Sequence, residues 1–192
     1  RLITERKADG FVLPRTRLQD PRVEMLCAAD VPFVLFGQHG DPDGCAWFDV
    51  DGASAMRDAA HLLVGRGHRR IGYVGGSPDY AYNGQREGGL RAGLADHGLT
   101  LPDRYIQRGA LNRRAGEAAT ERLLDLPEPP TAIVFALDRA ALGAYRPAAA
   151  RGLHVGQDLA VVANDGGPDG AIAGPPHARW AGDWLARGWP IC

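Results

Sequence analysis

Short apolar runs alternate with amphipathic helical segments along most of this chain, about six times in all. Three of the runs, Phe11–Leu13, Pro32–Phe36 and Ile71–Val74, are continuous rather than interrupted by polar residues. Continuous apolar runs are typical of parallel strands that helices cover on both faces. The pattern therefore predicts an α/β fold with a mostly parallel sheet. At 192 residues, the chain is long enough for one large domain or two lobes with separate cores.

The second half of the chain keeps the same alternation. Short strands are predicted at 105–107, 132–136 and 159–163, and the helix that Asp138 is expected to cap contains Pro147. A proline inside a helix costs about 3 kcal/mol unless the helix bends there. Parallel sheets bind ligands at the carboxyl ends of their strands, so the residues that follow each strand are the first candidates for a binding site.

Composition excludes several classes of protein. Lysine and arginine number 22, and aspartate and glutamate 23, so the net charge is -1. This balance excludes a polybasic nucleic-acid module, and a hydrophobic content of 45% excludes a disordered chain. No apolar stretch approaches the roughly 20 residues of a membrane span, so we expect no membrane partner. The three cysteines lack CxxC spacing, which favours a reducing compartment and a cytoplasmic protein.

The sequence offers little support for catalysis. Its only serines, Ser54 and Ser77, lie outside a GxSxG motif, and neither a GxGxxG nor a GKS/GKT phosphate-binding motif occurs. The six histidines show no paired spacing of the kind that metal ligands have. We therefore expect no enzymatic activity, no metal and no cofactor.

Seven short blocks occur in a recognisable order. The most specific are GHRRI at Gly67–Ile71 and VGQDLAVV at Val155–Val162. The other blocks are Asp9–Leu13, Val31–Gly37, Phe48–Gly52, Arg86-x-x-Gly89 and Ala132–Asp138 with Ala141–Ala144. In this order and spacing they resemble the effector-binding core of transcriptional regulators of the lactose-repressor and galactose-repressor (LacI/GalR) family, from Arg1 to Pro176.

The resemblance implies a type I periplasmic-binding-protein-like fold, with two parallel-sheet lobes and a ligand cleft between them. The implied domains are a partial N-terminal lobe at 1–53, a C-terminal lobe at 54–163, and a crossover segment with an atypical tail at 164–192. Against the family pattern the N-terminal lobe is incomplete. The Thr-Thr-Val-like strand that usually continues the family core is not visible after Pro176.

The resemblance also implies a function, namely the ligand-sensing and dimerisation core of a bacterial transcriptional repressor. Its expected partners are a small sugar-like effector, a second copy in a homodimer, and operator DNA. DNA binding is expected only through a helix-turn-helix headpiece that is missing from this chain. A secreted solute-binding protein of a sugar transporter is the alternative, because its fold is nearly the same. The residues encoded before Arg1, a helix-turn-helix or a signal peptide, would distinguish the two.

Three charged residues are the main ligand-binding candidates that the resemblance implies. Arg86 would hold ligand hydroxyls or a carboxylate with its planar guanidinium, unless it is only a surface residue. Asp165 would accept two sugar hydroxyls, unless it serves only the Asn-Asp-Gly turn. Asp138 is either a ligand contact or a helix N-cap. Leu137 stands where the family often has a polar ligand contact.

Five further residues complete the candidate set. Tyr80 and Tyr82 precede Arg86 and could stack on a sugar ring or a base, although loop tyrosines often pack on the surface. Arg15 could meet an anionic group, although a solvated loop residue is the simpler interpretation. Gln38 adjoins a position that is acidic in some sugar-binding relatives, and Leu111 stands where some relatives have a stacking aromatic ring.

Overall fold

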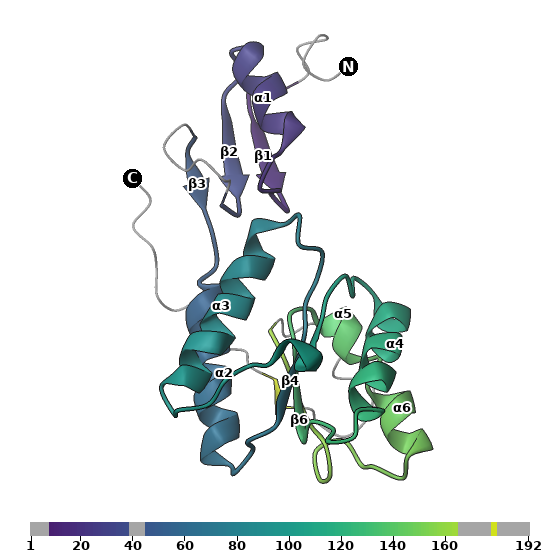
Figure 1. Cartoon of the computed structure of the whole chain (residues 1–192). Coiled ribbons are helices and arrows are strands. Elements are labelled where there is room, and N and C mark those ends of the chain that lie inside the picture. Colours follow the sequence, from purple (N-terminus) through teal and green to yellow (C-terminus); the bar gives the residue numbers. More distant parts are fainter. Residues whose placement is uncertain (1–7, 39–44, 165–177, 180–192) are drawn as a thin grey trace. The chain divides into compact units, whose positions relative to one another are not determined.

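The computed structural model describes residues 8–38, 45–164 and 178–179. The chain forms two compact units, one made of Arg1–Val50 with Asp79–Gly84 and the other of Asp51–Pro78 with Gln85–Cys192. Each unit contains a sheet whose paired strands are all parallel. The prediction of an α/β fold with parallel sheets is confirmed (Figure 1). The lobe boundaries inferred from the sequence stay a prediction.

The first unit is a three-stranded sheet in the order β1-β2-β3 with one helix. Its elements are β1 (Phe11–Pro14), α1 (Pro21–Ala28), β2 (Phe33–Phe36) and β3 (Trp47–Phe48). Asp20 caps α1 by accepting a hydrogen bond from the Arg22 amide at 3.1 Å, and Pro21 occupies the first helical position, which a proline tolerates. Leu13, Leu35 and two α1 residues, Val23 and Leu26, form the small core of the unit.

The second unit is built around a five-stranded sheet in the order β5-β4-β6-β7-β8. Its strands are β4 (Ile71–Val74), β5 (Ile106–Gln107), β6 (Ala132–Phe135), β7 (Ala160–Ala163) and β8 (Ala178–Arg179). Its helices are α2 (Gly52–Gly65), α3 (Ala81–Ala95), α4 (Arg113–Leu124), α5 (Asp138–Ala141) and α6 (Tyr145–Ala150), with a 3-10 turn at Asp103–Tyr105. The first turn of α3 is grouped with the first unit and the rest of the helix with the second.

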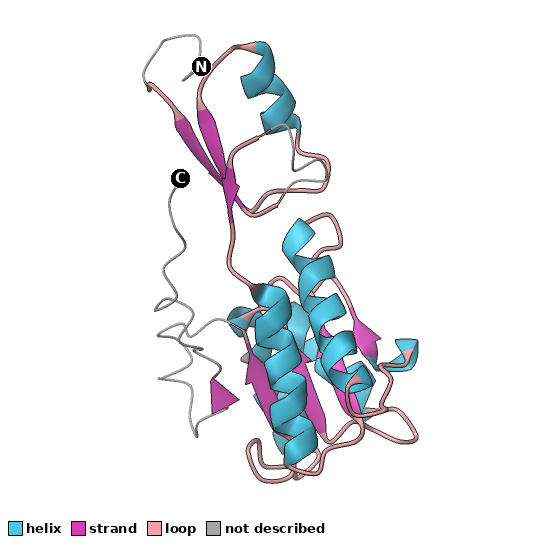
Figure 2. Cartoon of the chain, turned by 90° about the vertical axis from the view of Figure 1, so that its left-hand side faces the viewer, coloured by secondary structure: helices cyan, strands magenta, loops and turns pink. Residues whose placement is uncertain are grey.

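Helices cover both faces of the second sheet, as the continuous apolar runs predicted. Helices α2 and α3 pack on one face, which Figure 2 views directly, and there Leu63 and Leu90 join Ile71 and Tyr73 in one core cluster. The other face packs against α4, α5 and α6 and includes Val74. Successive side chains of a strand point to opposite faces, so a strand buried on both sides needs an apolar residue at nearly every position.

Two features differ from the sequence-based expectation. The helix expected from Asp138 is divided into α5 and α6, and Pro147 is the third residue of α6. The first amides of a helix have no acceptor within it, so a proline there loses no hydrogen bond. A strand is also present after Pro176, because β8 pairs in parallel with β7 through Val162 and Ala178. It is only two residues long, too short to produce an apolar run.

In the described part of the chain, no helix is long and apolar enough to cross a membrane. Cys27 is exposed, and Cys45 is half-buried.

Candidate functional site

The carboxyl ends of the strands in the second unit form one connected rim. The Gly75 amide donates to the Gln107 carbonyl at 2.8 Å, and the Ala110 amide donates to the Gly75 carbonyl at 3.0 Å. The Ala136 amide in turn donates to the Val74 carbonyl at 2.9 Å. These bonds extend the strand pairing beyond the strands, so the loops that follow β4, β5 and β6 are held together at this edge. This is the edge at which parallel sheets bind ligands.

Arg86 of α3 lies at this rim. Its Nη1 donates a hydrogen bond to the carbonyl oxygen of Ala136, the residue that directly follows β6. Its side chain also passes close to the first residue of α2, because a Cβ on Gly52 would lie 3.1 Å from Arg86 Cγ and 3.2 Å from Nε. Arg86 is half-buried. A guanidinium anchored in this way presents its flat donor fork in a defined orientation.

Asp138 and Leu111 also follow strands of this sheet. Asp138 is the first residue of α5, whose N-cap is Leu137, and Leu137 makes no side-chain capping bond. The sequence-based interpretation of Asp138 as an N-cap is therefore wrong by one position. A short helix such as this one has no strong signal for its start. Leu111 follows β5, and 45% of its surface is exposed.

One polar residue at this rim was missed as a site candidate. Asn164 directly follows β7 and is buried, with 3% of its surface exposed. The sequence places Asn164 among the residues that follow predicted strands, but it was not chosen as a ligand contact. The sequence feature that could have identified Asn164 is its position directly after a buried strand, because such residues lie at the carboxyl edge of the sheet. Asp165, the next residue, lies outside the described residues.

Four candidates belong to the first unit. Arg15 follows β1, is exposed, and has a left-handed backbone with φ of 54°. The guanidinium of Arg22 holds this turn, because its Nη2 donates to the carbonyl oxygens of Pro14 at 3.1 Å and Arg15 at 3.2 Å. Gln38 follows β2 and is half-buried. Non-glycine residues in the left-handed region are uncommon and are often found at functional loops.

Tyr80 and Tyr82 stack on each other, with ring centres 5.7 Å apart and ring planes inclined by 17°. Arg17 pairs with Tyr80 through an antiparallel bridge, and its guanidinium carbon lies 5.9 Å from the Tyr80 ring centre. The Leu18 amide donates to the Asp79 carbonyl at 2.9 Å. The two candidate tyrosines are thus held beside the loop that follows β1, a proximity that sequence distance conceals.

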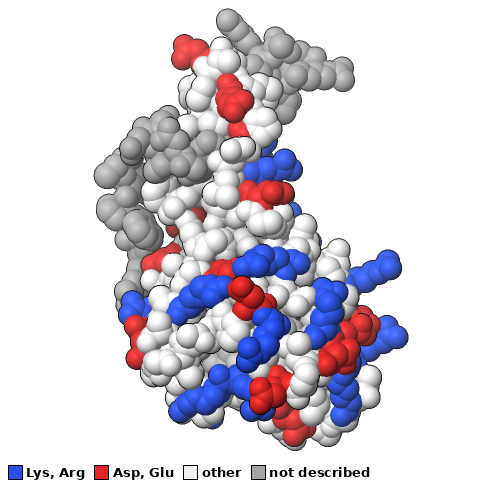
Figure 3. Space-filling model, viewed as in Figure 1, with Lys and Arg blue, Asp and Glu red and all other residues white. Residues whose placement is uncertain are grey.

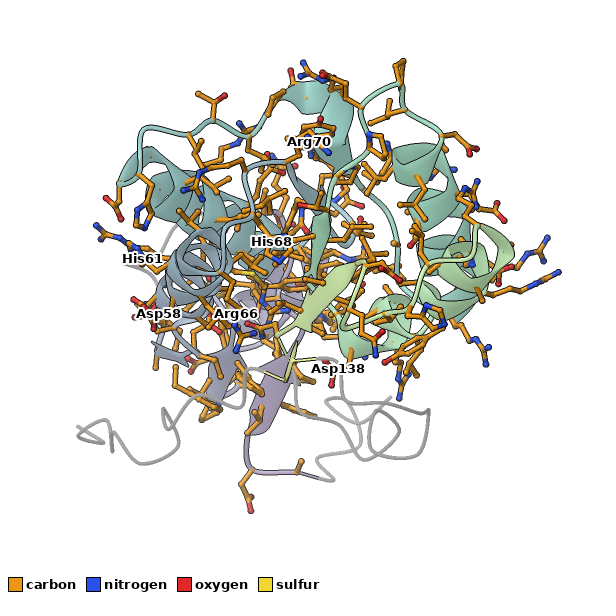
Figure 4. The ribbon with its side chains drawn as sticks, turned by 90° about the horizontal axis from the view of Figure 1, so that it is seen from below. Asp58, His61, Arg66, His68, Arg70 and Asp138 are labelled. Atoms are coloured by element: carbon orange, nitrogen blue, oxygen red, sulfur yellow. The ribbon has the colours of Figure 1, made fainter. Side chains whose placement is uncertain are left out.

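The GHRRI motif lies at the opposite, amino end of β4 and does not contribute to this rim. His68 Nδ1 is 2.9 Å from Thr131 Oγ1, and Arg70 Nε donates to the Pro129 carbonyl at 2.9 Å. Arg69 Nη1 donates to the Val64 carbonyl at 3.0 Å near the end of α2. Figure 4 labels His68 and Arg70. This motif therefore joins the ends of α2, β4 and β6 through these hydrogen bonds and lies away from the rim.

Acidic and basic side chains are interspersed on the face of the molecule that Figure 3 shows. Many of the arginines are paired with acids. Glu87, whose side chain is 13% exposed, accepts hydrogen bonds from both Arg91 and Arg108. Further pairs are Arg57–Asp96, Arg146–Glu117 and Arg151–Asp125. Among the described residues, no group of three or more His, Cys, Asp and Glu side chains is arranged to hold a metal ion.

Residues 60–178 match the periplasmic binding protein-like domain family. The chain is 36% identical over 166 residues to the HTH-type transcriptional regulator AglR of Rhizobium meliloti (strain 1021). The aligned region covers 86% of this chain and 47% of that protein. It is 38% identical to a solved regulatory protein of the LacI family from Chloroflexus aggregans, with a TM-score of 0.80 over 87% of this chain and 60% of the other.

A solved complex of the transcriptional regulator CelR with cellobiose is 31% identical to this chain, with a TM-score of 0.81. The match covers 90% of this chain and 53% of that structure. The chain spans about half the length of the curated relatives that it matches.

Proposed function

Because the chain belongs to the periplasmic binding protein-like domain family and resembles the effector-binding core of LacI-family transcriptional regulators, we propose that it senses a small sugar-like ligand. In this proposal the chain is the ligand-binding and dimerising part of a bacterial repressor. DNA binding is the task of a helix-turn-helix headpiece outside these 192 residues. A ligand that binds one conformation better than another shifts the population between them, and thereby alters the affinity for operator DNA.

The observation that carries the proposal is the position of Arg86. Its guanidinium is anchored to the Ala136 carbonyl at the carboxyl edge of the sheet, where parallel sheets bind ligands. An arginine there can donate several fixed hydrogen bonds to sugar hydroxyls or to a carboxylate. Asp138, Asp165, Leu111, Arg15, Gln38, Tyr80 and Tyr82 remain proposed further contacts. Leu111 and Leu137 add apolar surface, which suits the flat face of a sugar ring.

A binding experiment tests the ligand class directly. The chain is titrated by calorimetry with cellobiose and a panel of other neutral mono- and disaccharides. We expect at least one saturable interaction, and a dissociation constant at least tenfold higher for Arg86→Met. Arg114→Met is the matched control, because Arg114 is an exposed residue of α4, and its affinity should be unchanged.

The outcomes distinguish the two roles that Arg86 can have. If Arg86→Met binds the sugar normally but unfolds at lower temperature, Arg86 only supports the rim, and the proposed contact is rejected. If no sugar binds to a wild-type chain that unfolds cooperatively, the sugar class is rejected. Arg86→Lys keeps the charge but loses the planar fork, so it should also bind more weakly.

The regulatory part of the proposal is tested separately, by sequencing the coding region around these 192 residues. A helix-turn-helix in front of the core supports a repressor that acts on operator DNA. A signal peptide in that place overturns the repressor and supports a secreted solute-binding protein. The sugar titration above is independent of this result.

A further inference from the structure

Two histidines that are distant in sequence touch each other on the outer side of α2 and α3. His61 belongs to α2, and His97 follows the end of α3. His61 Nδ1 lies 2.8 Å from His97 Nε2, and the two rings are nearly perpendicular, with an interplanar angle of 72°. Figure 4 shows His61 and Asp58 on the outer side of α2, away from the sheet. The 36-residue separation explains why histidine spacing gave no sign of this pair.

The Asp96 carboxylate orients the His61 ring, on the side opposite His97. Asp96 Oδ2 lies 3.2 Å from His61 Nε2, the ring nitrogen that does not face His97. Arg57 holds that carboxylate with two hydrogen bonds, from Nε to Oδ2 at 2.7 Å and from Nη2 to Oδ1 at 3.0 Å. A carboxylate at Nε2 favours the tautomer that carries its proton there, so the lone pair of Nδ1 points toward His97.

Backbone hydrogen bonds fix the backbone that carries the second ring. The His97 amide donates to the Leu94 carbonyl at 3.0 Å, and the Leu99 amide donates to the same oxygen at 3.0 Å. Gly98 between them has a left-handed φ of 68°. This arrangement is typical of a helix C-terminus that ends at a glycine. His97 is thus presented by a rigid turn, and His61 by the middle of a regular helix.

We propose that His61 Nδ1 and His97 Nε2 bind a divalent transition-metal ion such as Zn²⁺ or Ni²⁺, with Asp96 orienting His61 and water completing the coordination. Imidazole nitrogen is a preferred ligand of these ions. An oriented ring whose other nitrogen donates to a carboxylate is the usual arrangement behind a metal-bound histidine. The site has two protein ligands, in keeping with the absence of any larger metal-ligating group among the described residues.

The distances fit such a site once the hydrogen bond between the two rings opens and the His97 ring adopts the tautomer with its proton on Nδ1, which frees the Nε2 lone pair for the ion. Two imidazole nitrogens that bind one tetrahedral Zn²⁺ at 2.0–2.1 Å lie about 3.3 Å apart. The present separation of 2.8 Å must therefore open by about half an ångström. His97 is exposed and the His61 side chain is 39% exposed, so both rings can turn toward solvent. The bound ion would link α2 to α3 and stabilise the second unit against unfolding.

The test uses the untagged chain, since a polyhistidine tag would bind the same ions. Thermal unfolding is followed without metal and with ZnCl₂ or NiCl₂, and binding is measured by calorimetry. We expect the metal to raise the Tm of the wild-type chain and the effect to disappear in His61→Ala and in His97→Ala. Asp96→Asn should retain binding with an affinity about tenfold lower, because it weakens only the orienting contact.

His154→Ala is the matched control. His154 is an exposed histidine with its own carboxylate partner, since its Nδ1 lies 3.1 Å from Asp158 Oδ2. This variant should keep the full metal-dependent rise in Tm. The proposal is overturned if the wild-type chain shows neither a Tm shift nor a heat of binding. It is equally overturned if the shift persists in both His61→Ala and His97→Ala, which would locate the ion at other residues.

Discussion

Gly89 of α3 lies directly against the backbone of α2, because a Cβ atom at position 89 would be 2.1 Å from the carbonyl oxygen of Ala53. One turn later, a Cβ on Gly93 would be 2.6 Å from the Arg57 carbonyl oxygen. By contrast, a Cβ on Gly88 would meet nothing within 4 Å. Gly89 is therefore needed for close packing of α3 on α2, whereas Gly88 has room for a side chain.

This contrast predicts opposite effects of the same substitution. Gly89→Ala should lower the free energy of unfolding by about 1–3 kcal/mol, the usual cost of overpacking, because helix backbones must move apart. Gly88→Ala should raise it by up to about 1 kcal/mol, since alanine is the better helix former. Urea unfolding at neutral pH measures both. A destabilising Gly88→Ala or a neutral Gly89→Ala would show that the α2–α3 packing differs from that described.

Asp20 predicts a loss of stability in acid. Hydrogen bonds from Arg22 lower the pKa of this buried carboxyl from 3.8 to about 2. The unfolded chain therefore binds the proton more readily than the folded chain between these values. The stabilisation is complete above pH 4 and is lost as the pH falls toward 2. It is on the order of 2 kcal/mol.

The variant Asp20→Asn tests that expectation. It should unfold more easily at neutral pH, because the ion pair with Arg22 is gone, and its stability should fall less between pH 4 and 2. The comparison is made by urea unfolding at several pH values, with Asp9→Asn as a control at an exposed carboxyl. Equal acid slopes in the wild-type chain and Asp20→Asn would contradict the assignment.

The general fold was predictable because its signals are local and redundant. Continuous apolar runs at Ile71–Val74 and at 132–136 indicated buried parallel strands, and β4 and β6 now pair through them. The β8 strand was missed because two residues carry no periodicity. The start of α5 was misplaced by one residue because a single turn has no amphipathic pattern.

The candidate site was harder to infer than the fold, because it depends on contacts between distant residues. Leu111 was a candidate only through the family resemblance. Position after a predicted strand singled out Arg15, Gln38 and Asp138 from sequence alone. It could not show that Arg86 is anchored to the Ala136 carbonyl, 50 residues away. Nor could it show that GHRRI, one of the two most specific motifs, lies at the other end of the sheet. A motif that identifies a family can mark its scaffold rather than its ligand site.

His68 within that motif predicts a second pH dependence, near neutral pH. Burial and the nearby Arg66 charge lower the pKa of His68 below its ordinary value of 6.5. The folded chain therefore favours the neutral ring that contacts Thr131, whereas the unfolded chain takes up a proton near pH 6.5. Stability should be highest above pH 7 and should decrease as the pH falls through 6.5.

The measurement is the free energy of urea unfolding between pH 7.5 and 5.5, for the wild-type chain, His68→Gln and the control His154→Ala. His68→Gln removes the titrating ring but leaves a polar side chain to contact Thr131, so its stability should change less with pH than that of the wild-type chain. His154→Ala removes a histidine at a different place, beside Asp158, and so shows whether a change in slope is specific to His68. A slope that is the same in all three chains would mean that His68 titrates alike in the folded and unfolded states. The contact at 2.9 Å between His68 and Thr131 would then contribute no pH-dependent stability to the junction of α2, β4 and β6.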